Sequence, residues 1–159
     1  MQRIVVGVDG SPESLAALQW AYDEATAHEA ELVVCYAYGT PEAYNPYALA
    51  YVTSAGAEGD DVPIPEASSR VATSRESAER VLNAVIGELL PSTPGARVTP
   101  LAVEGDRPAR TLIELAEGAD LLVVGSRGRG GFSGLVLGSV SQQCAQHAPC
   151  PVAIIRPTE

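Results

Sequence analysis

The chain alternates between short apolar runs and longer segments with helical periodicity. Five runs consist largely of aliphatic residues without polar alternation, which is typical of parallel strands covered on both faces. Between them, apolar residues recur every three or four positions, which predicts amphipathic helices. We expect strands at residues 3–9, 31–38, 97–103, 121–124 and 151–156, and helices at residues 12–28, 69–90, 106–117 and 139–147.

Several residues mark the ends of these elements. Ser11 is a good N-cap and Pro12 a good first residue for the first helix, and Asp106 is expected to cap the third. Ser139 stands where the N-cap of the last helix is expected. Pro100, inside the third strand, lacks an N–H donor for the sheet, so this strand belongs at an edge.

Five strands alternating with four helices predict a doubly wound α/β fold. With the third strand at an edge, we expect an open parallel five-stranded sheet of order 3-2-1-4-5 with helices on both faces, a Rossmann-like arrangement. Ligands of such folds bind beyond the carboxyl ends of the strands, where the strand order reverses. The reversal falls between the strands that end in Asp9 and Gly125, so we expect these residues to line one crevice.

At 159 residues the chain fits one domain, residues 1–159, with a substantial core. From about residue 39 to residue 68 it is rich in Pro, Gly, Tyr and acidic residues and shows no sustained period, so we expect a long flexible loop. Tyr44, Tyr47 and Tyr51 in this loop are candidates for covering a bound nucleotide.

The charge balance is strongly acidic. Twenty acidic against ten basic residues give a net charge of -10 at pH 7, which argues against nucleic acid or an anionic membrane as a partner. Arg107, Arg127 and Arg129 nevertheless lie in or just before the Gly-rich C-terminal third. A locally positive site on an acidic body suits a small anionic ligand.

The location of the protein is expected to be cytoplasmic. The apolar stretch near Met1 is too short for a signal peptide, and no apolar run approaches the roughly 20 residues that cross a bilayer. Cys35, Cys144 and Cys150 are odd in number and lack metal-type spacing, so we expect reduced, mostly buried thiols.

The segment after the fourth strand is the clearest pointer to function. Residues 125–139 are Gly-rich and lead into the last helix, and such a loop lets main-chain N–H groups and a helix N-terminus hold an anion. Asp9 is a candidate for holding a ribose hydroxyl or, through a divalent cation, phosphates. A purely structural role remains open for both residues. The Asp9 carboxylate could accept hydrogen bonds within its own turn, and Ser139 could cap the last helix.

The spacing of the glycines carries a more specific signal. The segment is neither a Walker loop nor a dinucleotide fingerprint. Two residues separate Gly125 from Gly128, and nine separate Gly128 from Gly138, which precedes Ser139. Together with the opening Val-Val-Gly-Val-Asp-Gly-Ser and the closing Pro-Val-Ala-Ile-Ile-Arg, this pattern resembles the nucleotide-binding signature of the universal stress protein family, in its ATP-binding branch, over the whole chain.

The resemblance implies an adenine nucleotide, ATP, with Mg²⁺ or Mn²⁺ held on Asp9. It implies that the main chain near Ala37 faces the adenine, that Gly125 and Gly128 allow close approach to ribose and phosphate, and that the start of the last helix binds the phosphates. The residues that it places at the ligand are Val8, Asp9, Gly10, Ser11, Ala37, Val124, Gly125, Arg127, Gly128, Arg129, Gly138, Ser139, Val140 and Ser141.

The implied function is that of a nucleotide-responsive stress regulator with at most slow ATP hydrolysis, because no obvious Glu or His base is attached to the loop. A homodimer through residues 152–156 is expected from the resemblance and because an exposed apolar edge strand invites pairing. Two alternatives remain open: a dimeric interaction or chaperone-like module in which the site is incidental, and cyclic AMP as the ligand.

Overall fold

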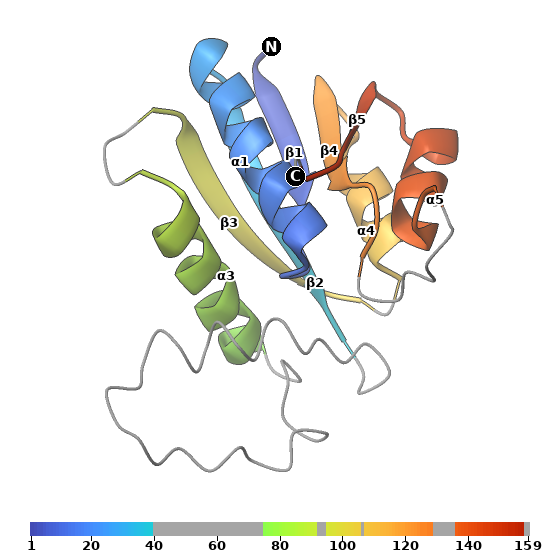
Figure 1. The fold of residues 1–159 in the computed structure, drawn as a ribbon, viewed down its shortest axis with the longest axis horizontal. Helices are drawn as coiled ribbons and strands as arrows, with labels where there is room; N and C mark the ends of the chain where they lie inside the picture. The colour runs from blue at the N-terminus through green and yellow to red at the C-terminus, as the bar shows by residue number, and fades with distance from the viewer. Residues whose placement is uncertain (40–74, 92–94, 106, 129–135, 158–159) are drawn as a thin grey trace.

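The computed structural model describes residues 1–39, 75–91, 95–105, 107–128 and 136–157. Its centre is a sheet of five parallel strands in the order β3-β2-β1-β4-β5 (Figure 1). The strand order and the parallel pairing predicted from the sequence are confirmed. The strands are β1 (Arg3–Gly7), β2 (Glu31–Tyr38), β3 (Arg97–Glu104), β4 (Leu121–Gly125) and β5 (Val152–Ile155).

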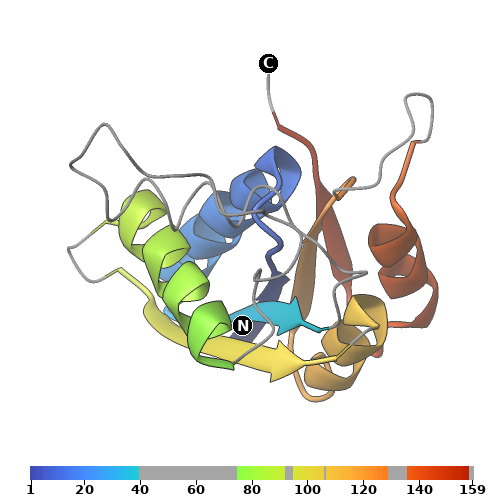
Figure 2. The same ribbon diagram turned by 90° about the horizontal axis from the view of Figure 1, so that it is seen from below.

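Helices cover both faces of the sheet, as expected for a doubly wound fold. The described helices are α1 (Pro12–Ala27), α3 (Arg75–Leu89), α4 (Pro108–Leu115) and α5 (Ser139–His147). Helices α1 and α3 lie on one face, and α4 and α5 on the other (Figures 1 and 2). Within the described part of the chain, every helix is too short or too polar to cross a membrane.

Side chains of each strand alternate between two apolar layers. Ile4 and Val6 pack with α1 and α3, whereas Val5 between them packs with α4 and α5. All three are completely buried. Because both faces of the strands are covered, the sequence shows apolar runs without polar alternation.

Three predicted boundaries are shifted by the hydrogen bonding of the main chain. β1 ends at Gly7 rather than residue 9, because the N–H groups of Asp9 and Gly10 turn to the Ser14 hydroxyl. The N-cap of α5 is Gly138 and not Ser139, because the Gly138 carbonyl accepts the first helical hydrogen bond. Likewise, Arg107 and not Asp106 is the N-cap of α4. Asp106, like residues 40–74 with most of the expected loop, lies outside the described residues.

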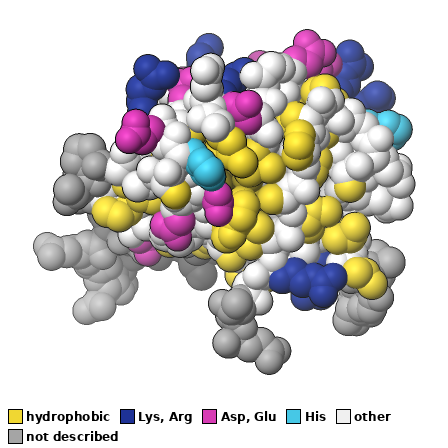
Figure 3. Space-filling view, turned by 90° about the horizontal axis from the view of Figure 1, so that it is seen from above, with side chains coloured by type: hydrophobic (Ala, Val, Ile, Leu, Met, Phe, Trp, Pro, Cys, Tyr) yellow, Lys and Arg dark blue, Asp and Glu magenta, His cyan; other side chains and the backbone are white. Residues whose placement is uncertain are grey.

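The two edges of the sheet differ in character. β3 forms one edge, as its proline predicts, and Pro100 stands opposite Val34 of β2. β5 forms the other edge, and each of its four apolar residues is only partly buried. Figure 3 views the molecule from above Figure 1 and shows apolar side chains gathered near the centre of the visible surface, with charges of both signs around them.

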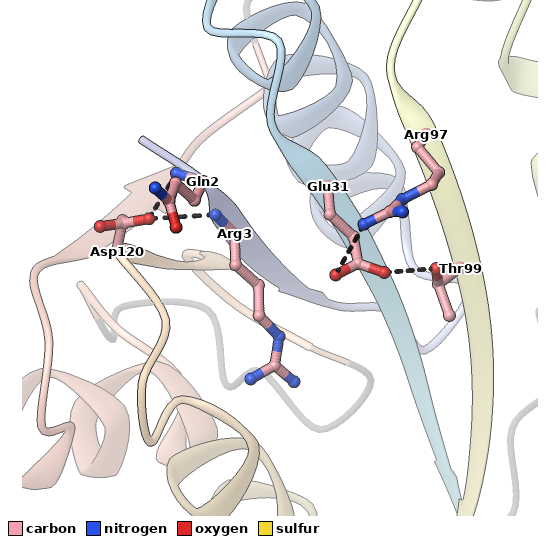
Figure 4. A network of polar contacts seen from close by, with 6 residues as sticks. All are labelled: Gln2, Arg3, Glu31, Arg97, Thr99 and Asp120. Atoms are coloured by element: carbon pink, nitrogen blue, oxygen red, sulfur yellow. Dashed lines mark hydrogen bonds and ion pairs between the residues drawn. The ribbon is translucent and has the colours of Figure 1, made fainter.

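The amino ends of the strands are tied together by polar contacts (Figure 4). Asp120 Oδ2 accepts hydrogen bonds from the main-chain N–H groups of Gln2 and Arg3, at 2.6 and 3.0 Å. These bonds lower the pKa of the Asp120 carboxyl group. Beside them, Glu31 pairs with Arg97 at 3.5 Å and accepts a hydrogen bond from Thr99. These contacts link the amino ends of β1 and β2 to the segments before β4 and at the start of β3.

Candidate functional site

The candidate site lies where β1 and β4 end side by side. The register pairs Val6 of β1 with Val123 of β4. Asp9 and Ser126, each three residues further along, therefore leave the sheet at the same level. Asp9 is also level with Ala37 of β2, because Gly7 pairs with Cys35. The topology thus places these parts of the predicted site at one end of the sheet.

The turn between β1 and α1 holds Asp9 in a defined position. Asp9 Oδ1 accepts hydrogen bonds from the N–H group of Ser11 at 2.9 Å and from its hydroxyl at 2.6 Å. The Ser14 hydroxyl accepts from the N–H groups of Asp9 and Gly10, at 3.2 and 3.1 Å. Gly10 has a φ of 83°, a conformation that favours glycine. Both serines are buried, so these hydrogen bonds are shielded from water.

Ser14 is a part of this site that the sequence interpretation missed. The Ser11 side chain caps α1 by accepting from the Ser14 N–H group at 3.3 Å, and the Ser14 hydroxyl donates back to the Ser11 carbonyl. A serine three residues after an N-cap serine resembles a capping box, and this spacing is the signal that points to it.

Close main-chain approaches at the glycines bring the two distant segments together. A Cβ added at Gly128 would lie 3.0 Å from Asp9 Oδ2. A Cβ added at Gly138 would lie 3.3 Å from Arg127 Cα and 3.4 Å from the Gly128 nitrogen. Gly128 therefore lies between the Asp9 carboxylate and the N-cap of α5. The two distant segments that the sequence interpretation assigned to one site thus lie next to each other, and their role as a binding site stays a prediction.

The buried residue Ser126 anchors the loop to the rest of the fold. Its N–H group donates to the Ile155 carbonyl at 2.7 Å, and its carbonyl accepts from the Gly138 N–H at 2.8 Å. The Ser141 hydroxyl, also buried, contacts the same carbonyl at 2.9 Å. Ser126 thus joins the end of β4 to β5 and to the start of α5.

The first turn of α5 has the character of an anion-binding position. No side chain caps Gly138, and Ser139 is exposed. Helix geometry leaves the N–H groups of the first turn without intrahelical acceptors, and the helix dipole favours negative charge there. Ser141 differs from its neighbour because its hydroxyl is buried against main-chain carbonyls.

Arg127 crosses to the first turn of α1. Its Nε lies 3.7 Å from Glu13 Oε1, and its side chain is 45% exposed. Beneath this ion pair, a Cβ added at Gly125 would lie 2.8 Å from the Glu13 carbonyl carbon, so the chains touch there. Val8 and Val124 are buried in the two apolar layers. Arg129 lies outside the described residues.

These groups define what the site can do chemically. The Asp9 carboxylate faces Gly128, whose other neighbour is the N-terminus of α5, and the Arg127 guanidinium pairs with Glu13 in the first turn of α1. Such an arrangement holds an anion and presents one carboxylate oxygen ligand to a divalent cation. In the described part of the chain, no group of three or more His, Cys, Asp or Glu residues is placed to hold a metal ion. Mg²⁺ fits nevertheless, because it is commonly bound by one carboxylate together with ligand phosphates and waters.

The fold is that of a doubly wound α/β protein, and Asp9, Gly128 and the start of α5 lie together at the switch point of its sheet. Residues 1–156 match the model of the universal stress protein family, and the chain belongs to this family. It is 34% identical over 153 residues to universal stress protein Rv2623 of Mycobacterium tuberculosis. The match covers 96% of this chain and 44% of that protein. Rv2005c of the same species is 35% identical, with 96% and 45% covered. The chain thus spans less than half the length of these relatives.

Solved structures support the same family and fold. UspA from Lactobacillus plantarum is 25% identical, with a TM-score of 0.65, and the match covers 98% of this chain and 97% of that one. A universal stress protein in complex with cAMP is 30% identical, with a TM-score of 0.56, and the match covers 98% and 96%. The predicted fold class and family are therefore confirmed.

Proposed function

We propose that this protein binds an adenine nucleotide, ATP with Mg²⁺ or Mn²⁺, at the carboxyl ends of β1 and β4. The observation that carries the proposal is the meeting of Asp9 and the start of α5 on either side of Gly128. A carboxylate and a helix N-terminus at this separation suit a metal-bound phosphate chain. The cAMP complex of a 30% identical family member supports an adenine nucleotide as the ligand class.

Each part of the site has a role in this proposal. Asp9 contributes the protein's oxygen ligand to the cation, which would neutralise phosphate charge when bound. Ser11 and Gly10 hold that carboxylate in place. Ala37 at the end of β2 offers main-chain groups to the adenine. The phosphates lie against the glycines and the start of α5, at Gly125, Gly128, Gly138, Ser139, Val140 and Ser141.

We expect at most slow ATP hydrolysis. Fast phosphoryl transfer to water needs a group that positions the water and a charge that stabilises the transferred phosphoryl. Two acidic side chains of the described site are already engaged, since Asp9 accepts from Ser11 and Glu13 pairs with Arg127. Ligand-dependent conformational change, rather than turnover, is the proposed output of a cytoplasmic stress regulator.

We further propose that two copies associate through residues 152–156. β5 is an edge strand of four apolar residues, each partly exposed. Pairing would cover a surface that otherwise promotes aggregation. If the chain instead acts as an interaction module, replacing Gly138 with a bulky residue will leave partner binding intact, whereas a nucleotide-dependent function will be lost.

Titration calorimetry with ATP, ADP, AMP and cyclic AMP, with and without Mg²⁺, tests the proposal. We expect ATP to bind more tightly with Mg²⁺, and Asp9→Asn to remove that Mg²⁺ dependence. Asp23→Asn, which makes the same change on the exposed side of α1, is the matched control and should bind as the wild type does. Absence of ATP binding would contradict the proposal, and tighter binding of cyclic AMP than of ATP would favour the alternative ligand. Native mass spectrometry of the same samples measures the dimer.

A further inference from the structure

The Glu13–Arg127 ion pair has an electrostatic setting that separates it from an ordinary surface pair. Glu13 lies in the first turn of α1, and the Arg127 main chain packs against Gly138, the N-cap of α5. The Arg127 main chain therefore lies beside the N-terminus of α5, and its guanidinium lies beside the first turn of α1, where the helix dipole favours anions and disfavours cations. A guanidinium in this position needs a negative partner, and Glu13 supplies one.

The two side chains are held together by the main chain beneath them. A Cβ at Gly125 would lie 2.8 to 3.0 Å from the carbonyl group and Cβ of Glu13, so the end of β4 rests directly on this residue. The Glu13 side chain is only 18% exposed, compared with 45% for Arg127. The carboxylate is thus the more buried member of the pair, and the guanidinium is the more accessible to an incoming anion.

We propose that Glu13 acts as an internal substitute for ligand phosphate on Arg127 and thereby sets the selectivity of the site among nucleotides with different numbers of phosphates. The inference depends on the nucleotide-binding function proposed above. A phosphate that reaches the start of α5 takes over Arg127, and Glu13 then remains beside it as a like charge. The penalty grows with the charge on the phosphate chain, so it is larger for ATP than for AMP.

Neutralising Glu13 tests this competition directly. Glu13→Gln keeps the size of the side chain and removes its charge. Because partly exposed ion pairs are worth up to about 1 kcal/mol, we expect ATP and inorganic tripolyphosphate to bind about fivefold more tightly, with AMP changed less than about twofold. The matched control is Glu24→Gln, which makes the same charge change in the last turns of α1, where Glu24 pairs with His28. It should leave all affinities unchanged.

A double-mutant cycle shows whether the effect acts through Arg127. In an Arg127→Gln background the competition for the guanidinium is absent and only the like charge of Glu13 remains, so Glu13→Gln should raise the affinity for ATP and tripolyphosphate by less than it does in the wild-type background. The inference is contradicted if Glu13→Gln leaves the ATP affinity unchanged or lowers it, if AMP gains as much as ATP, or if the gain is just as large without Arg127. Those results leave nucleotide binding itself intact, whereas a wild-type protein that binds no nucleotide contradicts both proposals.

Discussion

An aspartate accepts main-chain hydrogen bonds at each end of the sheet. Asp120 at the amino end bonds to a distant segment of the chain, whereas Asp9 at the carboxyl end bonds to its own turn. At the amino end, Asp120 bonds to Gln2 and Arg3, more than a hundred residues away in the sequence, through a single oxygen. At the carboxyl end, Asp9 bonds to Ser11 in its own turn through Oδ1, while Oδ2 lies toward Gly128.

This difference separates a carboxylate with a structural role from one that we propose binds a ligand. Asp120 joins the start of β1 to the residue just before β4, so its bonds are part of the fold. Asp9 is fixed locally by Ser11, and the fold then carries it to a second segment made close by glycine. The same type of side chain thus stabilises the fold at one end of the sheet and is proposed to bind the ligand at the other.

Gly125→Ala should have the largest effect of the substitutions considered, on both stability and ATP affinity at the carboxyl end of the sheet. The new methyl group would lie 2.8 Å from the Glu13 carbonyl carbon, so the end of β4 and the start of α1 must move apart. We expect a loss of about 1 to 3 kcal/mol in the free energy of unfolding and a loss of about tenfold or more in ATP affinity. Denaturant unfolding and calorimetry measure the two effects.

The control for this substitution is Gly87→Ala in α3, where an added Cβ has nothing within 4 Å. It should stabilise the protein by up to about 1 kcal/mol and leave ATP binding unchanged. Normal stability and affinity in Gly125→Ala would show that the contact with Glu13 does not constrain the site.

Removing the two aspartates should separate binding from stability. Asp9→Ala is expected to reduce ATP affinity by about tenfold or more, because a charge-assisted contact is lost. Asp120→Ala should leave the affinity within about twofold but lower the thermal midpoint, because two N–H groups of the first strand lose their acceptor. Affinity and midpoint measured on both variants check the separation, and equal effects of the two substitutions on affinity would contradict it.

Acid should weaken the amino end of the sheet through Asp120. The hydrogen bonds from Gln2 and Arg3 lower the pKa of this carboxyl group from its ordinary value of 3.8 in the folded protein. The unfolded chain therefore binds the proton at higher pH, and the stabilisation, complete above the ordinary pKa, is lost as the pH falls through the lowered one. The difference in unfolding midpoint between wild type and Asp120→Asn should shrink on acidification. A difference independent of pH would exclude this contribution.

The smallest expected effect concerns the ion pair at the amino end. Arg97 and Glu31 are separated by 3.5 Å, and Arg97 is 77% exposed. Arg97→Gln should change the free energy of unfolding by less than about 1 kcal/mol and leave nucleotide affinity unaltered. Arg127→Gln is the matched change at the carboxyl end and should weaken ATP binding. Equal effects of Arg97→Gln and Arg127→Gln on ATP affinity would contradict the assignment of the binding site to the carboxyl end.

Most of the fold could be predicted from the sequence because its causes are local or topological. Uninterrupted apolar runs required strands with two covered faces, and Pro100 required an edge, which fixed the strand order. The boundaries were less accurate because hydrogen bonds decide them. The N-cap of α5 is Gly138, one residue before the predicted Ser139, because the Gly138 carbonyl accepts the first helical hydrogen bond. The apolar periodicity of the sequence does not reveal this bond.

The candidate site was predicted in outline and missed in detail for the same reason. Topology was sufficient to bring Asp9 beside the glycine loop. The sequence interpretation missed Ser14 and Glu13 because their roles depend on neighbours that only the folded structure shows. Ser14 reads as an ordinary helical serine until its hydroxyl is seen to accept two turn N–H groups, and Glu13 as a surface residue until Arg127 is placed beside it.

The anchoring of Ser126 has a consequence for redesign. Its N–H group donates to the Ile155 carbonyl and its carbonyl accepts from the Gly138 N–H group, so its position between β4 and α5 depends largely on main-chain atoms that any residue except proline supplies. The side chains at positions 13 and 127 lie outside that scaffold. An engineer could therefore exchange them to retune which anions are preferred while the underlying frame keeps its shape.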